Sequence, residues 1–183
     1  MVGVIVARLQ PIHNGHIALI TKAASECERV IVLVGSADKL NKRNPLPIDF
    51  RLKLAKSALV NLENVEVYPL DDLSDESHDD ILWGFYLYSH IVSLIHDSNF
   101  TLYYSDGYEK VALWFPGFIL RNNVSLSLLA RNSCEDGISA TKVREYLLNN
   151  DDENLKNVVP ESVYAEKDAI LRYMDLLRYY EDT

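Results

Sequence analysis

The chain carries two histidines three residues apart, within the run His13-Asn14-Gly15-His16. Side chains at this spacing lie on the same side of a helix, so both imidazoles can face one ligand. Gly15 allows the backbone to approach that ligand closely. At the start of a helix, the first backbone N–H groups and the positive end of the helix dipole would also face it. These features together favour the binding of a phosphate.

Two other interpretations compete with a phosphate site. A lone histidine is more often an ordinary core or surface residue, but Arg8 and Gln10 stand just before this pair and favour a functional role. A structural zinc site would need further ligands, and His78, His90 and His96 form no matching pattern. We therefore expect the histidine pair to bind phosphate rather than metal.

A second candidate lies at residues 138–144, which read Ile-Ser-Ala-Thr-Lys-Val-Arg. Ser139 is suited to cap the start of a helix, Thr141 would lie in its first turn, and Arg144 one turn further on. Two hydroxyls, helix amides and a guanidinium can together hold a polyphosphate. Taken alone, the pattern indicates simple helix capping more often than binding. Its combination with the histidine pair is far more specific.

Elements that alternate along the chain must position these two motifs. Continuous apolar runs separated by helices are typical of a parallel sheet buried on both faces, which binds ligands at the carboxyl ends of its strands. We expect strands at residues 1–7, 29–35, 65–70 and 100–104, and a fifth within 118–130. We expect helices at 17–27, 48–62, 81–96, 108–114 and 139–148, and then helix to the end, with Pro160 near the start of the last helix.

This order predicts an α/β fold, an open parallel sheet with helices on both faces and a C-terminal helical appendage. The acidic stretch Asn149 to Glu153 is the one candidate boundary. It divides a domain at 1–150 from helices at 151–183, which we expect to pack on the domain or on a partner subunit.

Composition limits the classes of partner. The net charge is −9, which argues against a general nucleic-acid surface, because such a surface needs a basic field. Cys27 and Cys134 form neither a disulfide framework nor a zinc motif, and they fit a reducing cytoplasm. No stretch approaches the roughly 20 apolar residues of a membrane span. We expect a soluble cytoplasmic protein that binds neither nucleic acid nor membrane.

The two motifs together resemble those of the nucleotidyltransferase superfamily, which has His-x-Gly-His after the first strand and Ile-Ser-x-Thr-x-x-Arg near the end of the domain. Within it, residues 7–16 are similar to Gly-Arg-Phe-Gln-Pro-Phe-His-Asn-Gly-His of nicotinamide-nucleotide adenylyltransferases, including the form fused in some proteins to a Nudix domain. Residues 35–39 and 79–83 resemble that family's Gly-Ser-Ala and Asn-Asp-x-x-Trp segments. The chain has no room for a Nudix domain. Departures stand at Ala7, Leu9, Ile12, Phe50 and Asp79.

The resemblance implies a Rossmann-like sheet and adenylyl transfer from ATP to nicotinamide mononucleotide, which gives NAD and pyrophosphate. It implies Mg²⁺ bridging the ATP phosphates, and a homo-oligomer is common in such families. It implies catalytic roles for Arg8, His13, His16 and Arg144. It implies ATP contacts from Gln10, Gly15, Lys42, Arg51, Gly107, Ser139 and Thr141, and acceptor contacts from Trp83 and Asp80.

Other functions stay open. A sister enzyme would act on phosphopantetheine or on another phosphate, whereas Trp83 and the Gln10-Pro11 pair favour the nicotinamide nucleotide. Trp83 also fits an ordinary place in the core, and Lys42 fits a solvated loop. A nucleotide sensor without catalysis is a third possibility, against which the complete set of phosphate-binding residues counts.

Overall fold

The computed structural model describes residues 1–73, 80–105, 110–129 and 138–181. Its centre is a five-stranded sheet in the order β3-β2-β1-β4-β5, and every pair of neighbouring strands is parallel. The strands are β1 (Val2–Ala7), β2 (Arg29–Val34), β3 (Val65–Pro69), β4 (Phe100–Ser105) and β5 (Val124–Leu129). The predicted Rossmann-like α/β fold is confirmed, and all five strands fall where the sequence places them.

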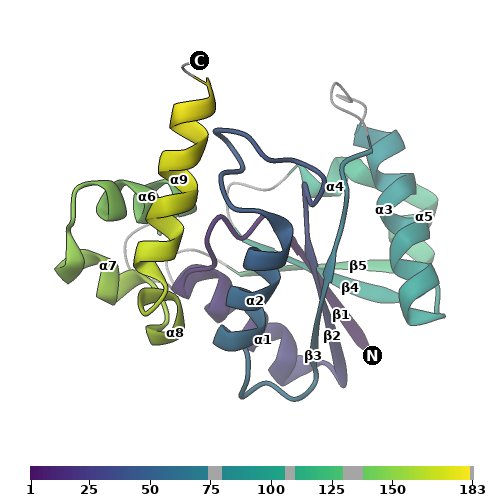
Figure 1. The fold of residues 1–183 in the computed structure, drawn as a ribbon. Helices are drawn as coiled ribbons and strands as arrows, with labels where there is room; N and C mark the ends of the chain where they lie inside the picture. Colours follow the sequence, from purple (N-terminus) through teal and green to yellow (C-terminus); the bar gives the residue numbers. More distant parts are fainter. Residues whose placement is uncertain (74–79, 106–109, 130–137, 182–183) are drawn as a thin grey trace.

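Helices cover both faces of the sheet (Figure 1). On one face lie α1 (Asn14–Glu26) and α2 (Ile48–Ala58), and on the other α3 (Asp80–Ile95), α4 (Val111–Trp114) and α5 (Gly117–Asn122). Alternation along the strands supplies both cores, because Val30 and Val32 face α1 and α2 while Ile31 and Leu33 face α3. Within the described ranges, no helix is both long and apolar enough to cross a membrane.

After β5, the described residues form four more helices: α6 (Ala140–Leu148), α7 (Asp152–Val158), α8 (Glu161–Tyr164) and α9 (Lys167–Glu181). Leu155, Val163 and Ile170 are buried in the same apolar cluster as α1 and α2. Lys53 of α2 also pairs with Glu166 at 2.5 Å. These helices therefore complete the core on the α1 face. The division at residue 150 and a contact with a partner subunit stay predictions.

The helix boundaries differ from expectation in places. The first helix begins at Asn14, three residues earlier than predicted, and α2 ends at Ala58 rather than at Leu62. Pro160 caps the short α8 and not the last helix. Helix α5 occupies part of the stretch expected to hold only the fifth strand. It is a six-residue helix, too short for a clear apolar period.

Helices α3 and α4 touch at Gly84, which lies against the backbone of Trp114. A Cβ atom on Gly84 would lie 1.5 Å from the carbonyl oxygen of Trp114, so no other residue fits without separating the helices. We expect Gly84→Ala to lower the free energy of unfolding by about 1–3 kcal/mol or more, as overpacking does. Urea unfolding measures the change.

Gly117→Ala is the matched control, because a Cβ there would lie 3.6 Å from its nearest neighbour, the flexible side chain of Arg121. We expect this variant to unfold close to wild type. A Gly84→Ala protein as stable as the control would contradict the close contact of α3 with α4.

Candidate active site at the carboxyl edge of the sheet

A cavity of about 510 Å³ opens at the carboxyl ends of β1, β2 and β4. It crosses the edge of the sheet, from α1 and α6 on one face to α3 and α4 on the other. Both sequence motifs line it, although they are separated by more than a hundred residues. The residues that the motifs contribute to the wall are Arg8, His13, His16, Ser139, Thr141 and Arg144.

The histidine pair is fixed by the start of α1. His13 precedes the helix in extended conformation, and its backbone N–H donates to Nδ1 of His16 over 3.3 Å. The two rings lie 3.8 Å apart between centroids. Because Nδ1 of His16 accepts a hydrogen bond, a neutral ring carries its proton on Nε2. Burial, and next the nearby His13, holds the pKa of His16 well below its usual range. His16 is therefore a neutral hydrogen-bond donor.

Gly15 and Asn14 hold this turn in place. A Cβ atom on Gly15 would lie 3.1 Å from the ring of His13, so a larger residue would push the imidazole away. The side-chain amide of Asn14 donates to the backbone carbonyl of Asn157 over 3.1 Å. This bond ties the start of α1 to α7. Gly15 thus leaves room for the ring of His13. The sequence had suggested a different reason for this glycine, the close approach of a ligand.

Helix α6 brings the second motif to the same wall. The hydroxyl of Ser139 accepts from the backbone N–H of Lys142 over 3.2 Å, which confirms the predicted cap. Arg144 donates to the backbone carbonyl of Gln10 over 2.7 Å and to the hydroxyl of Thr141 over 3.4 Å. Burial, and next the charge of Arg8, lowers the pKa of Arg144. Two cations thus share this side of the cavity, and an anion between them would relieve their repulsion.

Arg51 holds together the backbone segments that follow β1 and β2, next to the cavity. Its side chain is fully buried, and it donates to the backbone carbonyls of Arg8, Gly35 and Ser36 over 2.8–2.9 Å. Burial, and next the charge of Arg8, lowers its pKa to about 10. The guanidinium joins the carboxyl ends of β1 and β2 but does not line the cavity. The sequence led us to expect a contact with ATP, whereas the geometry gives Arg51 a supporting place.

Gln10 lines the cavity and also anchors the loop at 36–47. The side-chain amide of Gln10 is buried, donates to the carbonyl of Leu46 and accepts from its N–H, so it anchors the loop. Lys42 is exposed and is not among the residues that line the cavity. Arg43, which the sequence did not single out from its basic neighbours, does line it. A lysine and an arginine side by side in a loop give no signal of which one faces inward.

On the α3 face the wall is aromatic. Trp83 lines the cavity, and Trp114 stands edge-on to it with 6.1 Å between ring centroids. Sequence reasoning proposed Trp83 but missed Trp114, which lies in the next helix after β4. Asp80 begins α3 and does not line the cavity, while Gly107 lies outside the described residues.

The donors around the cavity suit a phosphate rather than a resident metal. Among the described residues, no three His, Cys, Asp or Glu side chains are grouped as metal ligands would be. The carboxylate of Asp72 lines the wall, and its Oδ1 accepts from the hydroxyl of Ser36 over 3.1 Å. Residues 71–80 are an acidic run whose composition indicates a solvated loop, so the sequence gives no signal for Asp72.

The sheet, the helix starts at its carboxyl edge and the cationic cavity define a nucleotide-binding α/β protein. The chain belongs to the cytidylyltransferase-like family of nucleotidyltransferases, whose family model matches residues 4–146.

Individual relatives extend this result. A nicotinamide-nucleotide adenylyltransferase of Methanolobus tindarius is 29% identical over 168 residues, which cover 90% of this chain and 86% of the relative. One of Thermococcus kodakarensis is 28% identical over 173 residues and covers 88% and 79%. A phosphopantetheine adenylyltransferase of Stenotrophomonas maltophilia is 44% identical over only 63 residues, 34% of this chain and 36% of the relative.

Solved structures share the fold. A bifunctional NMN adenylyltransferase/ADP ribose pyrophosphatase of Francisella tularensis matches 98% of this chain with a TM-score of 0.72 at 17% identity. The chain spans about half of that protein, 53% of its length. The same protein in complex with AMP and a manganese ion matches with a TM-score of 0.69. At this identity the likeness shows the fold alone.

The neutral state of His16 gives a second prediction. The unfolded chain takes up a proton at His16 near the ordinary pKa of about 6.5, whereas the folded protein does so only at lower pH. The folded state therefore loses stability as pH falls through this interval. We expect the free energy of unfolding to fall less between pH 7.5 and 5 in His16→Asn than in wild type.

Urea unfolding at a series of pH values measures both slopes. His96→Asn is the control, because His96 is exposed at the end of α3, where its positive φ suits asparagine. We expect the control to keep the wild-type slope. Identical slopes in His16→Asn and wild type would show that His16 is not held neutral by the fold.

Proposed function

We propose that the chain is a nicotinamide-nucleotide adenylyltransferase, which joins ATP and nicotinamide mononucleotide to give NAD and pyrophosphate. One observation carries the proposal: a single cavity combines a cationic wall on the α1 and α6 side with two tryptophans on the α3 and α4 side. The first wall suits a triphosphate and the second a flat ring. The two relatives that match most of the chain are described as enzymes of this activity.

In this reaction an oxygen of the acceptor's 5′-phosphate attacks the α-phosphorus of ATP. The new P–O bond forms as the bond between the α-phosphorus and the bridging oxygen of pyrophosphate breaks, so charge builds up on the departing pyrophosphate. No protein nucleophile takes part. The protein has to hold two mutually repelling anions in line and to stabilise the transferred charge.

The geometry gives each side chain a task. The Nε2–H of His16 donates a hydrogen bond to a phosphate oxygen and, because the ring is neutral, adds no charge to the site. Arg8 and Arg144 offset the negative charge of the acceptor's 5′-phosphate and of the ATP phosphates. The N-terminus of α6, with Ser139 and Thr141, holds the β- and γ-phosphates. His13 lies beside His16 and completes the donor set.

Magnesium enters this proposal with its substrate, as MgATP. The wall offers one carboxylate, Asp72, and no group of metal ligands among the described residues, so phosphate oxygens and water would hold the ion. The manganese ion with AMP in the Francisella protein agrees with a divalent ion that accompanies the nucleotide.

The choice of acceptor gives a third prediction. With ATP and Mg²⁺, we expect pyrophosphate release with a pyridine mononucleotide and none with phosphopantetheine, because phosphopantetheine has no ring to stack on Trp83. A coupled pyrophosphate assay over a panel of acceptors measures this. Release only with phosphopantetheine would favour the sister enzyme. ATP binding without release for any acceptor would favour a nucleotide sensor.

The fourth prediction concerns His16 in catalysis. Loss of one donor to a developing charge typically costs about 2.7–4 kcal/mol of barrier. We expect His16→Asn to lower kcat by about 10²–10³-fold, while the Kd for ATP, measured by calorimetry, changes much less. His96→Asn is again the control and should keep both values. Equal losses in kcat and in ATP affinity would contradict this prediction and show that His16 only binds ATP.

A further inference from the structure

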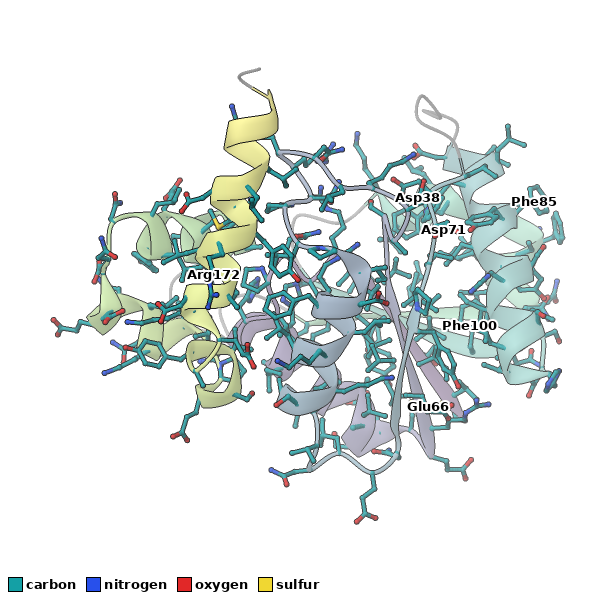
Figure 2. All side chains as sticks on the ribbon, in the orientation of Figure 1. Asp38, Glu66, Asp71, Phe85, Phe100 and Arg172 are labelled. Atoms are coloured by element: carbon teal, nitrogen blue, oxygen red, sulfur yellow. The ribbon has the colours of Figure 1, made fainter. Side chains whose placement is uncertain are left out.

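An acidic turn that contains Asp71 and Asp72 lies against Tyr86 of α3, beside the aromatic wall of the cavity. Asp72 lines the wall, held by the hydroxyl of Ser36. The backbone N–H of Asp72 donates to a carboxylate oxygen of Asp38 over 2.9 Å, which brings a second carboxylate to the same turn. Figure 2 shows Asp38 and Asp71 on this side of the molecule, toward α3. Lys39 pairs with Asp38 at 2.8 Å and offsets one of these charges.

Tyr86 connects this acidic turn with the tryptophans. Its hydroxyl donates to the backbone carbonyl of Asp71 over 3.0 Å, and its ring lies 5.5 Å from the ring of Trp83 between centroids. Burial, and next the charges of Asp71, Asp38 and Asp72, raises the pKa of Tyr86. The carboxylates therefore act on Tyr86, whose ring packs against the ring of Trp83.

The cavity is therefore electrically polarised. Burial, and next the charge of Arg8, lowers the pKa of Arg144 on the α6 side, while one carboxylate, that of Asp72, lines the wall beside the turn that Tyr86 of α3 contacts. The charge of Asp72 also acts on Arg51, but Nη1 and Nη2 of Arg51 donate to three backbone carbonyls beneath the cavity, and its side chain does not line the wall. A ligand with an anionic group at one end and a cationic ring at the other matches this arrangement.

The two pyridine mononucleotides differ at one end only. Both have a 5′-phosphate and a positively charged pyridinium ring, but the nicotinic acid form carries an additional carboxylate on the ring. An aromatic wall attracts the cationic ring of either. A nearby carboxylate attracts the ring and repels the additional carboxylate.

We propose that Asp72 is a specificity-determining residue, which favours nicotinamide mononucleotide over nicotinic acid mononucleotide by charge repulsion within the cavity that Trp83 and Trp114 also line. This inference rests on the proposed function, since it concerns the acceptor in the same cavity. It requires no contact between Asp72 and the reacting phosphates. The negative charge of the Asp72 carboxylate alone would decide between the two acceptors.

Asp72→Asn tests the inference, because asparagine has nearly the same shape and keeps an oxygen that can accept from Ser36. The measurement is kcat/KM for each mononucleotide at low salt. We expect wild type to favour the nicotinamide form. We expect the ratio of the two kcat/KM values to fall by about tenfold in Asp72→Asn, equivalent to about 1.4 kcal/mol, mainly through a lower KM for the nicotinic acid form. Added salt should shrink the wild-type preference.

Asp49→Asn is the matched control, since it removes the same charge from an exposed position in the first turn of α2, away from the cavity. We expect it to leave the ratio unchanged. An unchanged ratio in Asp72→Asn, in an enzyme that uses either mononucleotide, would overturn this inference and leave the proposed function standing. Turnover of neither mononucleotide by wild type would overturn the proposed function and the inference with it.

Discussion

The hydrogen bond from Arg144 to the backbone carbonyl of Gln10 joins two segments that are 134 residues apart in the chain. It fixes the N-terminus of α6 against the turn between β1 and α1, and this contact makes one cavity out of two motifs. The parallel sheet makes the contact possible, because β1 lies at its centre and delivers its carboxyl end to the edge where α6 returns. Val143 and Leu147, buried in the core beside α1 and α2, hold α6 in the same place.

The structure brings two cations together at this contact. Arg8 and Arg144 repel each other, and Arg51 lies directly beneath them with its donors directed at backbone carbonyls. His16, in contrast, is kept neutral, so it adds a donor without adding to the repulsion. Such a site is preorganised for an anion, because folding already holds the cations in place against their mutual repulsion.

Much of the architecture follows from the sequence alone. Apolar runs predict the first four strands and place the fifth within 118–130, and alternation of strand and helix predicts the parallel order, because right-handed crossovers leave few other topologies. The two motifs could be placed at one site because both stand at the starts of helices. Short α5 escaped prediction, since six residues carry too little periodicity.

The direction of individual side chains could not be predicted in the same way. Gln10 and Arg51 have the residue types of ligand-binding groups, yet both direct their donors at the backbone, because neighbouring loops offer unpaired carbonyls. Trp114 reaches the cavity only because Gly84 lets α4 approach α3 closely. Asp72 stands in an acidic loop whose composition indicates solvation. Each of these placements depends on contacts between distant segments, which no local pattern encodes.

A crystal structure of the protein with a non-hydrolysable ATP analogue and nicotinamide mononucleotide would test the central claim most directly. The account predicts the α-phosphate within hydrogen-bond distance of Nε2 of His16, the outer phosphates at the start of α6, and the pyridinium ring against Trp83. A triphosphate bound away from His16 and Arg144, or a ring remote from both tryptophans, would contradict it.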